Sequence, residues 1–188
     1  MATLGFKKII IGILDDEEKV TKVYEMDAKE GGAIEAKITG LAPETTKLPA
    51  SNVNFYVSSS GTGDTKLSLG IADLQDDALA AIVGAQVEKG IMKIDDKTKA
   101  PYVAVILETE GLNNEPIYIA LTKGKFSRDG DELKTGDSKG KEVNTDSLEG
   151  EFISRGFDGL VYAKGRQKAA EFDYKEFEAL IFNGYTPS

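Results

Sequence analysis

The feature that most constrains the fold is a succession of short apolar segments, many with two-residue periodicity, separated by clusters of Gly, Asp and Asn. This pattern is typical of β-strands that place one face on a core and the other in water. The segments that fit it are Gly5–Leu14, Lys19–Met26, Ala33–Thr39, Val53–Val57, Lys66–Ile71, Gly90–Ile94, Tyr102–Thr109, Pro116–Thr122, Gly124–Arg128, Leu148–Ser154 and Leu160–Ala163. The chain is therefore predicted to be mainly β.

One of these segments differs from the others in having no alternation. Tyr102–Leu107 is apolar throughout, which indicates a strand in the middle of a sheet that is covered on both faces. Gly111–Asn114 then forms a turn signal before a second apolar run, Ile117–Leu121. This pair predicts an antiparallel hairpin.

Two segments follow a helical period instead. In the first, Asp73 is the expected N-cap and Gly84 the expected stop, and the apolar face consists of Leu74, Ala78, Ala81 and Ile82. In the second, the spacing of Ala170, Tyr174, Phe177 and Ile181 predicts a helix that ends at Asn183-Gly184. An edge strand remains the alternative for the second segment, because it is rich in Phe and lies near a terminus.

The remaining chain contains long polar or Pro-containing connections. Leu41–Asn52 and Ser58–Thr65 flank the short strand Val53–Val57, so Leu41–Thr65 is expected to extend from the core as one excursion. Asp129–Thr145 is a second long loop. Such loops in a compact domain often bind partners. The expected architecture is a single domain over residues 1–188, an antiparallel β-sandwich or barrel of mainly β (α+β) class with one flanking helix and long loops.

Composition excludes most familiar kinds of catalytic and metal site. The chain has no His and no Cys, which removes imidazole bases, thiolate nucleophiles, zinc fingers and iron–sulfur sites. Its net charge is −9, without a basic stripe that would hold nucleic acid through phosphate contacts. No apolar run approaches the ~20 residues that span a bilayer, so no membrane partner is expected.

The residues that could still support chemistry are carboxylates and Gly-rich loops. The pairs Asp15-Asp16, Asp76-Asp77 and Asp95-Asp96 lie at predicted turns or at a helix start, where solvated carboxylates are common. Asp129–Glu132 lacks the later ligands of a calcium loop. The stretches Gly61–Gly63 and Gly136–Lys141 do not have the phosphate-loop spacing. We expect no catalytic residue, cofactor or metal site.

Segments in a fixed order resemble the major tail protein, or tail tube protein, of long-tailed siphophages that infect Gram-positive bacteria. They are Leu4–Ile9, Lys29–Ile34, Ile38–Pro43, Ala50–Asn52, Ala100–Val105, Pro116–Leu121, Lys123–Ser127, Leu133–Thr135 and Leu148–Arg155. The series covers nearly the whole chain, and Lys123–Ser127 is its most characteristic member. Some relatives carry a C-terminal immunoglobulin-like module, which we do not expect here.

The resemblance implies a structural virion protein of the phage tail. Its copies would form hexameric rings, and the rings would stack into a tube that conducts DNA to the host without sequence-specific binding. The implied partners are further copies of the chain, the tape-measure protein, the tail terminator and distal tail proteins, with assembly in the bacterial host cytoplasm. The candidates for contacts between subunits or rings lie in the excursion: Leu41, Pro43, Leu48, Val53, Phe55 and Tyr56.

Two alternatives from other classes remain open at this point. One is a non-catalytic carbohydrate-binding β-sandwich of a phage receptor-binding apparatus, which requires exposed aromatic side chains on one face. The other is a carboxylate-dependent glycosidase, which requires two carboxylates across a cleft.

Overall fold

The computed structural model describes residues 3–43, 45–50, 53–59, 61–130 and 145–185, with side chains described outside residues 44–60. The strands are β1 (Thr3–Leu14), β2 (Val20–Met26), β3 (Ala33–Thr39), β4 (Thr45–Ala50), β5 (Val53–Ser59), β6 (Thr65–Ile71), β7 (Gln86–Glu88), β8 (Ile91–Lys93), β9 (Val103–Gly111), β10 (Pro116–Ser127), β11 (Asp146–Phe152) and β12 (Tyr162–Arg166). The helices are α1 (Asp76–Val83) and α2 (Tyr174–Ile181). This mainly β content confirms the expected class.

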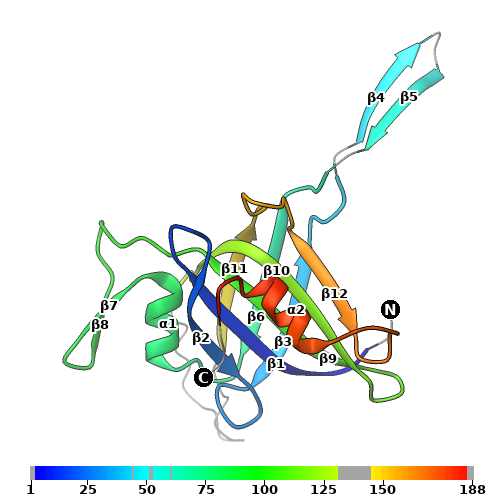
Figure 1. Cartoon of the computed structure of the whole chain (residues 1–188). Helices are drawn as coiled ribbons and strands as arrows, with labels where there is room; N and C mark the ends of the chain where they lie inside the picture. The colour runs from blue at the N-terminus through cyan, green and yellow to red at the C-terminus, as the bar shows by residue number, and fades with distance from the viewer. Residues whose placement is uncertain (1–2, 44, 51–52, 60, 131–144, 186–188) are drawn as a thin grey trace, which may run out of the picture.

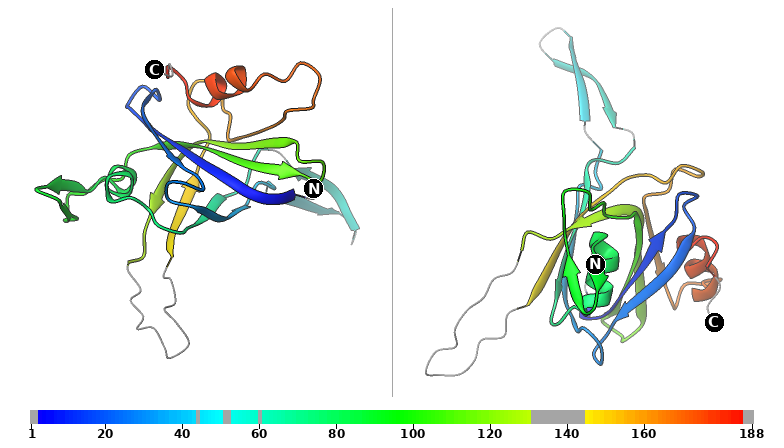
Figure 2. Two further views of the ribbon diagram at one scale, coloured as in Figure 1. Left: turned by 90° about the horizontal axis from the view of Figure 1, so that it is seen from below. Right: turned by 90° about the vertical axis from the view of Figure 1, so that its left-hand side faces the viewer.

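One curved antiparallel sheet forms the body of the molecule (Figures 1 and 2). Its strand order is β2-β1-β9-β10-β11-β6-β3, and β12 also pairs with β10. Curvature brings β3 close to β1, but no backbone ladder joins them among the described residues. The sheet is therefore open and resembles a sandwich.

Two apolar clusters lie on opposite faces of this sheet. The inner cluster contains Ile9, Ile11 and Val105 together with Ile82 of α1. The outer cluster contains the intervening residues of the same strands, such as Ile10 and Ile106, and packs against α2 (Figure 2). Alternate side chains of β1 and β9 thus serve different cores, which explains why these strands are apolar at successive positions.

The central strand and the hairpin are confirmed. β9 lies between β1 and β10, and Val103 to Leu107 are buried. The turn that follows closes through a hydrogen bond from the Gly111 amide to the Glu115 carbonyl, at 2.9 Å.

The second half of this hairpin differs from expectation. β10 continues from Pro116 to Ser127, where two strands were predicted. Its ladder with β9 shifts between Leu121 and Gly124, so the strand bends without ending. The first half of β10 pairs with β12 and the second half with β11.

The first helix begins later than predicted, and Asp73 is not its N-cap. The N-cap is Gln75, which makes no side-chain capping bond, and the first helical hydrogen bond joins the Leu79 amide to the Gln75 carbonyl at 2.9 Å. Asp73 lies in a bend before the helix, where its amide donates to the Gly31 carbonyl beside β3. The predicted stop is confirmed, since Gly84 adopts the left-handed conformation.

The second segment is a helix and not an edge strand. Asp173 caps α2 by accepting a hydrogen bond from the Lys175 amide. Phe177 and Ile181 are buried against the outer face of the sheet, as their spacing predicted. The described part of the chain thus has two short helices, one on each face of the sheet. No helix in the described ranges is long and apolar enough to cross a membrane.

The expected loop Leu41–Asn52 contains a strand, which corrects that assignment. β4 pairs with β5 in a two-stranded ladder separate from the main sheet. The register runs from Leu48 opposite Tyr56 directly to Pro49 opposite Asn54, which leaves Phe55 as an extra residue. An irregularity of this kind accommodates proline, which has no amide hydrogen to give to a ladder.

Candidate functional site

The hairpin β4–β5 extends well away from the body of the molecule (Figure 1). Its register pairs Thr45 with Ser59 at the base and Ala50 with Val53 near the tip. Four of the candidate contact residues, Leu48, Val53, Phe55 and Tyr56, belong to these two strands, and their side chains lie outside the described part. The hairpin backbone places all four beyond the main sheet, where a second molecule could reach them.

The root of the hairpin is a close backbone crossing that requires glycine. Gly40 has a φ of +72°, and a Cβ at this position would lie 1.8 Å from the Asp64 carbonyl oxygen. A Cβ on Gly63 would lie 2.5 Å from the Ala42 carbonyl oxygen. Thr65 strengthens the crossing because its hydroxyl lies 3.4 Å from the Gly40 carbonyl. The segment that enters the hairpin and the segment that leaves it are thereby held against one another.

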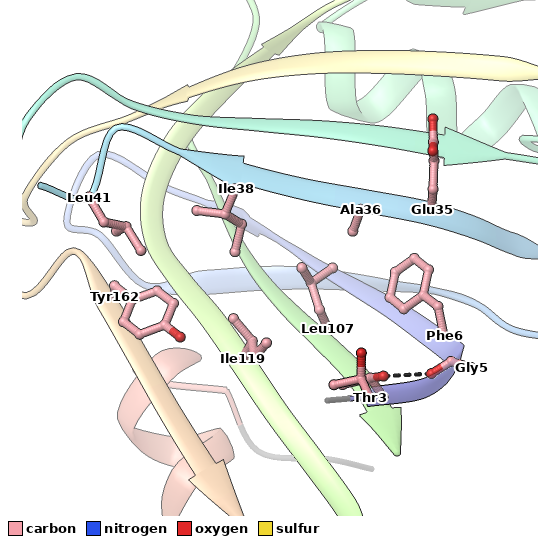
Figure 3. Close-up of a pocket in the computed structure, with 11 residues that line it drawn as sticks. Thr3, Gly5, Phe6, Glu35, Ala36, Ile38, Leu41, Leu107, Ile119 and Tyr162 are labelled. Carbon is pink, nitrogen blue, oxygen red and sulfur yellow. Dashed lines mark hydrogen bonds between the residues drawn. The ribbon is translucent and has the colours of Figure 1, made fainter. Parts of the chain in front are cut away.

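The other two candidate residues, Leu41 and Pro43, lie at this root and are half-buried. Leu41 also lines a cavity of about 560 Å³ beneath the edge of the sheet. Figure 3 shows Leu41 and Ile38 on one side and Tyr162, Ile119 and Leu107 across the space. The lining is mostly apolar, and Glu35 is its one charged residue among those described.

The strand beside this cavity is an edge of the sheet. β3 pairs with β6 on one side, and on the other it has no strand partner among the described residues. Its exposed side chains include the apolar Ile34. The unpaired backbone groups of an edge strand can accept a further strand, and at this edge of β3 the nearest neighbour is β1, which lies close by without a ladder.

A second polar arrangement lies in the connection between β11 and β12. Arg155 is 4% exposed, and its guanidinium donates hydrogen bonds to both carboxylate oxygens of Asp158 at 2.7 Å. A third bond, at 2.6 Å, reaches the carbonyl of Leu180 in α2. Together these bonds attach the connection to the helix. The neighbouring guanidinium is the main reason that the pKa of the Asp158 carboxyl lies below its usual value.

The turn between β1 and β2 holds the same connection from its other side. Glu18 accepts hydrogen bonds from the Gly156 amide at 2.9 and 3.1 Å, and from Lys123 at 2.6 Å. Its φ of 60° is unusual for a residue with a side chain, and these bonds stabilise it. The bond from Lys123 is the largest cause of a lowered pKa for the Glu18 carboxyl, followed among favourable contacts by the Gly156 amide.

Solvated turns were the prediction for the carboxylate pairs, and the structure confirms it. Asp15 accepts bonds from the amides of Glu17 and Lys19, and Asp95 accepts one from Lys97. Asp76 and Asp77 are exposed in the first turn of α1. In the described part of the chain, no group of three or more acidic side chains is placed to hold a metal ion. The stretch Gly136–Lys141 and most of Asp129–Thr145 lie outside the described residues.

Sequence reasoning missed the polar bonds around residues 155–158. Arg155 closed the series of segments that carried the family resemblance, but nothing in its neighbours indicated burial. Leu180, which accepts a bond from Arg155, and Glu18, which accepts one from the Gly156 amide, lie far away in the sequence, and only the folded sheet brings them together. The one local signal is Asp158, three residues after Arg155, which matches the spacing of a tight charged turn.

Comparison with known proteins gives one informative result. The family model described as phage tail tube protein matches residues 1–188, the whole chain. A search of curated proteins finds no match.

Proposed function

The chain belongs to the phage tail tube protein family and is a structural protein of the virion tail, and we propose that its copies form hexameric rings stacked into a tube. The observation that carries this proposal is the family match over residues 1–188. Phage DNA would pass through the tube to the host, a Gram-positive bacterium. The tube is assembled in the host cytoplasm around the tape-measure protein and is completed by terminator and distal tail proteins. The chain performs no catalysis.

The open sheet supports closure into rings. An unpaired β3 would leave backbone donors and acceptors without strand partners in a single copy, and pairing with a neighbour satisfies them. Cyclic assembly repeats one such contact around the ring until the β3 strand of every copy is paired. The apolar side chain of Ile34 on this strand would add buried area to the contact.

The hairpin β4–β5 supports contacts between rings. It extends beyond the body, and its glycine-dependent root fixes the direction in which it leaves (Figure 1). We assign the contacts to Leu41 and Pro43 at the root and to Leu48, Val53, Phe55 and Tyr56 along the two strands. A rigid root lowers the entropy that is lost when such an arm binds a neighbour.

Electron microscopy of the concentrated protein tests the proposal. Negative-stain images of the purified full chain, taken over a concentration series, are expected to contain rings or tubes. The expected rings have six-fold symmetry in end views. A protein that stays monomeric by analytical ultracentrifugation at the highest concentration, with no rings in any image, would contradict the proposal.

A deletion of the hairpin tests whether it is needed for contacts between rings without disturbing the main sheet. A variant in which a short Gly-Ser linker replaces residues 45–59 is expected to keep the circular dichroism and cooperative unfolding of the parent, because β4 and β5 pair only with each other. It is expected not to form tubes. The matched control shortens β7–β8, the other separate hairpin, and is expected to retain tubes. If the variant without residues 45–59 forms tubes of ordinary length, the hairpin has no role in contacts between rings. The same conclusion follows if both deletions reduce tube formation equally.

The two alternative functions receive less support. The exposed aromatic side chains in the described part are Tyr102 and Phe157, which form no extended platform for a sugar. The carboxylate pairs are exposed at turns and in the first turn of α1, without the apolar surroundings that an acid catalyst requires. Glycan-array binding, or turnover lost on mutation of those pairs, would restore one of these functions.

A further inference from the structure

Three residues with exposed apolar side chains lie near the buried Arg155 in the sequence or are bound by it. Phe157 is 58% exposed, Ile153 is 50% exposed and Leu180 is 47% exposed. Arg155 contacts two of these residues: its guanidinium lies 4.4 Å from the centroid of the Phe157 ring and donates a hydrogen bond to the backbone carbonyl of Leu180. Ile153 precedes Arg155 by two residues. We refer to Ile153, Phe157 and Leu180 as the Phe157 surface.

The turn that presents Phe157 is held from several directions. Within the turn, the Gly159 amide donates to the Arg155 carbonyl and the Arg155 amide to the Leu160 carbonyl. Asp158 binds the Leu160 amide as well as the Arg155 side chain. From outside, Glu18 binds the Gly156 amide and α2 binds Arg155. Residues from three separate parts of the chain therefore fix one exposed turn.

Holding the turn with a buried arginine costs free energy that a solvent-exposed turn would not have to offset. Burial of a guanidinium removes its hydration, and the bonds to Asp158 and Leu180 are needed to offset that loss. An aromatic side chain fixed in advance on a rigid turn loses little entropy when a partner covers it. Aromatic anchors with apolar neighbours are also the residues that contribute most to protein interfaces. The arrangement is that of a binding anchor.

The Phe157 surface continues from the root of hairpin β4–β5. Ile153 lines a shallow hollow together with Asp64 and Lys66, the residues that lead from the hairpin into β6. Figures 1 and 2 show the β11–β12 connection at the same end of the sheet as the hairpin. A molecule that contacts the hairpin root therefore meets this surface next.

We propose that the Phe157 surface is a contact for a second copy of this chain, with Phe157 as its anchor. The inference rests on the proposed self-assembly, since the copy that engages the hairpin is the one that reaches Ile153. The contact is heterologous, so a different surface of the second copy covers Phe157. This extends the assembly contacts beyond the excursion Leu41–Thr65.

The absence of tryptophan from the chain provides a direct test. Phe157→Trp introduces a single tryptophan whose emission reports only this position. In dilute subunits its emission should be that of exposed indole and acrylamide should quench it readily. In tubes, the emission is expected to shift to shorter wavelength and the quenching constant to fall at least threefold. Tubes in which this tryptophan is quenched as readily as in subunits would overturn the proposal and leave the tube function intact.

A second pair of variants measures the contribution to assembly. Phe157→Ser is expected to shift the unfolding curve of the subunit only slightly, because the side chain is mostly exposed and loses only its stacking on Arg155. It is expected to raise the concentration required for polymerisation by about tenfold or more. The matched control is Leu112→Ser. Leu112 is an exposed apolar residue in the turn before β10, whereas the β11–β12 connection lies beside the middle of that strand. For this variant we expect less than about a threefold change in the concentration required for polymerisation. If both variants raise the concentration required for polymerisation equally, replacing any exposed apolar residue by Ser weakens assembly. That result would overturn the anchor role of Phe157. Failure of the unmodified chain to polymerise would instead count against the proposed function.

Discussion

At the scale of single residues, Arg155 shows how a buried charge can organise a surface. Its side chain is almost fully enclosed, yet its hydrogen bonds reach Asp158 and the last turn of α2. A bidentate arginine–carboxylate pair has a planar geometry that lysine cannot reproduce. The residue therefore does two things: it neutralises Asp158 and it determines where the turn lies relative to the helix.

Loss of this side chain should destabilise the fold strongly. Arg155→Ala is expected to lower the free energy of unfolding by about 2–4 kcal/mol, because the Leu180 carbonyl and Asp158 lose their charged donor. The control is Lys7→Ala, which removes an exposed ion pair with Glu110 and is expected to leave the unfolding curve nearly unchanged. Urea unfolding followed by circular dichroism measures both. Equal costs would mean that burial adds nothing to the Arg155 interactions.

The carboxylates on either side of the turn predict a loss of stability in acid. The folded-state pKa values of Glu18 and Asp158 are both below their usual values. Their contribution is therefore fully present above the unfolded-state pKa of each carboxyl and is lost as the pH falls through the folded-state value. The free energy of unfolding should decline progressively below about pH 5.

A double-mutant cycle attributes part of that decline to one contact. Glu18→Gln should reduce the slope of unfolding free energy against pH in the acidic range. In the background Lys123→Gln the same change should have a smaller effect, since the largest cause of the lowered pKa has been removed. An unchanged slope in Glu18→Gln, measured by urea unfolding at each pH, would contradict the assignment.

At the scale of elements, the sequence predicted strands far better than it predicted their ends and partners. β9 was recognisable because both of its faces are apolar, and the α2 spacing was recognisable because its buried face repeats every turn. β4 was missed because its proline argues against a central strand, while a separate ladder with an irregularity tolerates it. The local sequence of a strand does not indicate which other strand will pair with it.

Helix caps illustrate the same limit. Asp73 and Asp173 both precede apolar helical periods, yet only Asp173 caps a helix. The backbone of Asp73 is held by Gly31, a residue distant in sequence, so the first helix starts at a later position. Similarly, the candidate contact residues could be placed in an excursion from their loop signals, but the glycine crossing at its root required the structure.

That crossing predicts a large effect from a small substitution. Gly40→Ala should lower the free energy of unfolding by more than about 3 kcal/mol, because strain at positive φ adds to a clash with the Asp64 carbonyl. Gly61→Ala is the matched control: it also has positive φ, but no atom lies within 4 Å of the added methyl, so about 1–2 kcal/mol is expected. Urea unfolding compares the two. Equal values would show that the crossing imposes no constraint beyond backbone conformation.

At the scale of the whole molecule, the negative charge is related to the proposed passage of DNA. The net charge is −9, and acids exceed bases in both halves of the chain. Favourable phosphate contacts repeated along a tube would hold the DNA, because each contact releases counterions and adds to affinity. A subunit with excess negative charge is expected to supply few such contacts to the lumen.

The excess of negative charge predicts that the protein does not bind duplex DNA, even when screening is weak. In electrophoretic mobility assays at about 50 mM salt, neither subunits nor preformed tubes are expected to retard a short duplex, since attraction to phosphate would be strongest under these conditions. The positive control is a basic DNA-binding protein of similar size, whose binding weakens as salt rises. Retardation by this chain with the same salt dependence would show that a local basic surface outweighs the overall charge. The DNA would then be held inside the tube, and the net charge could not account for its passage.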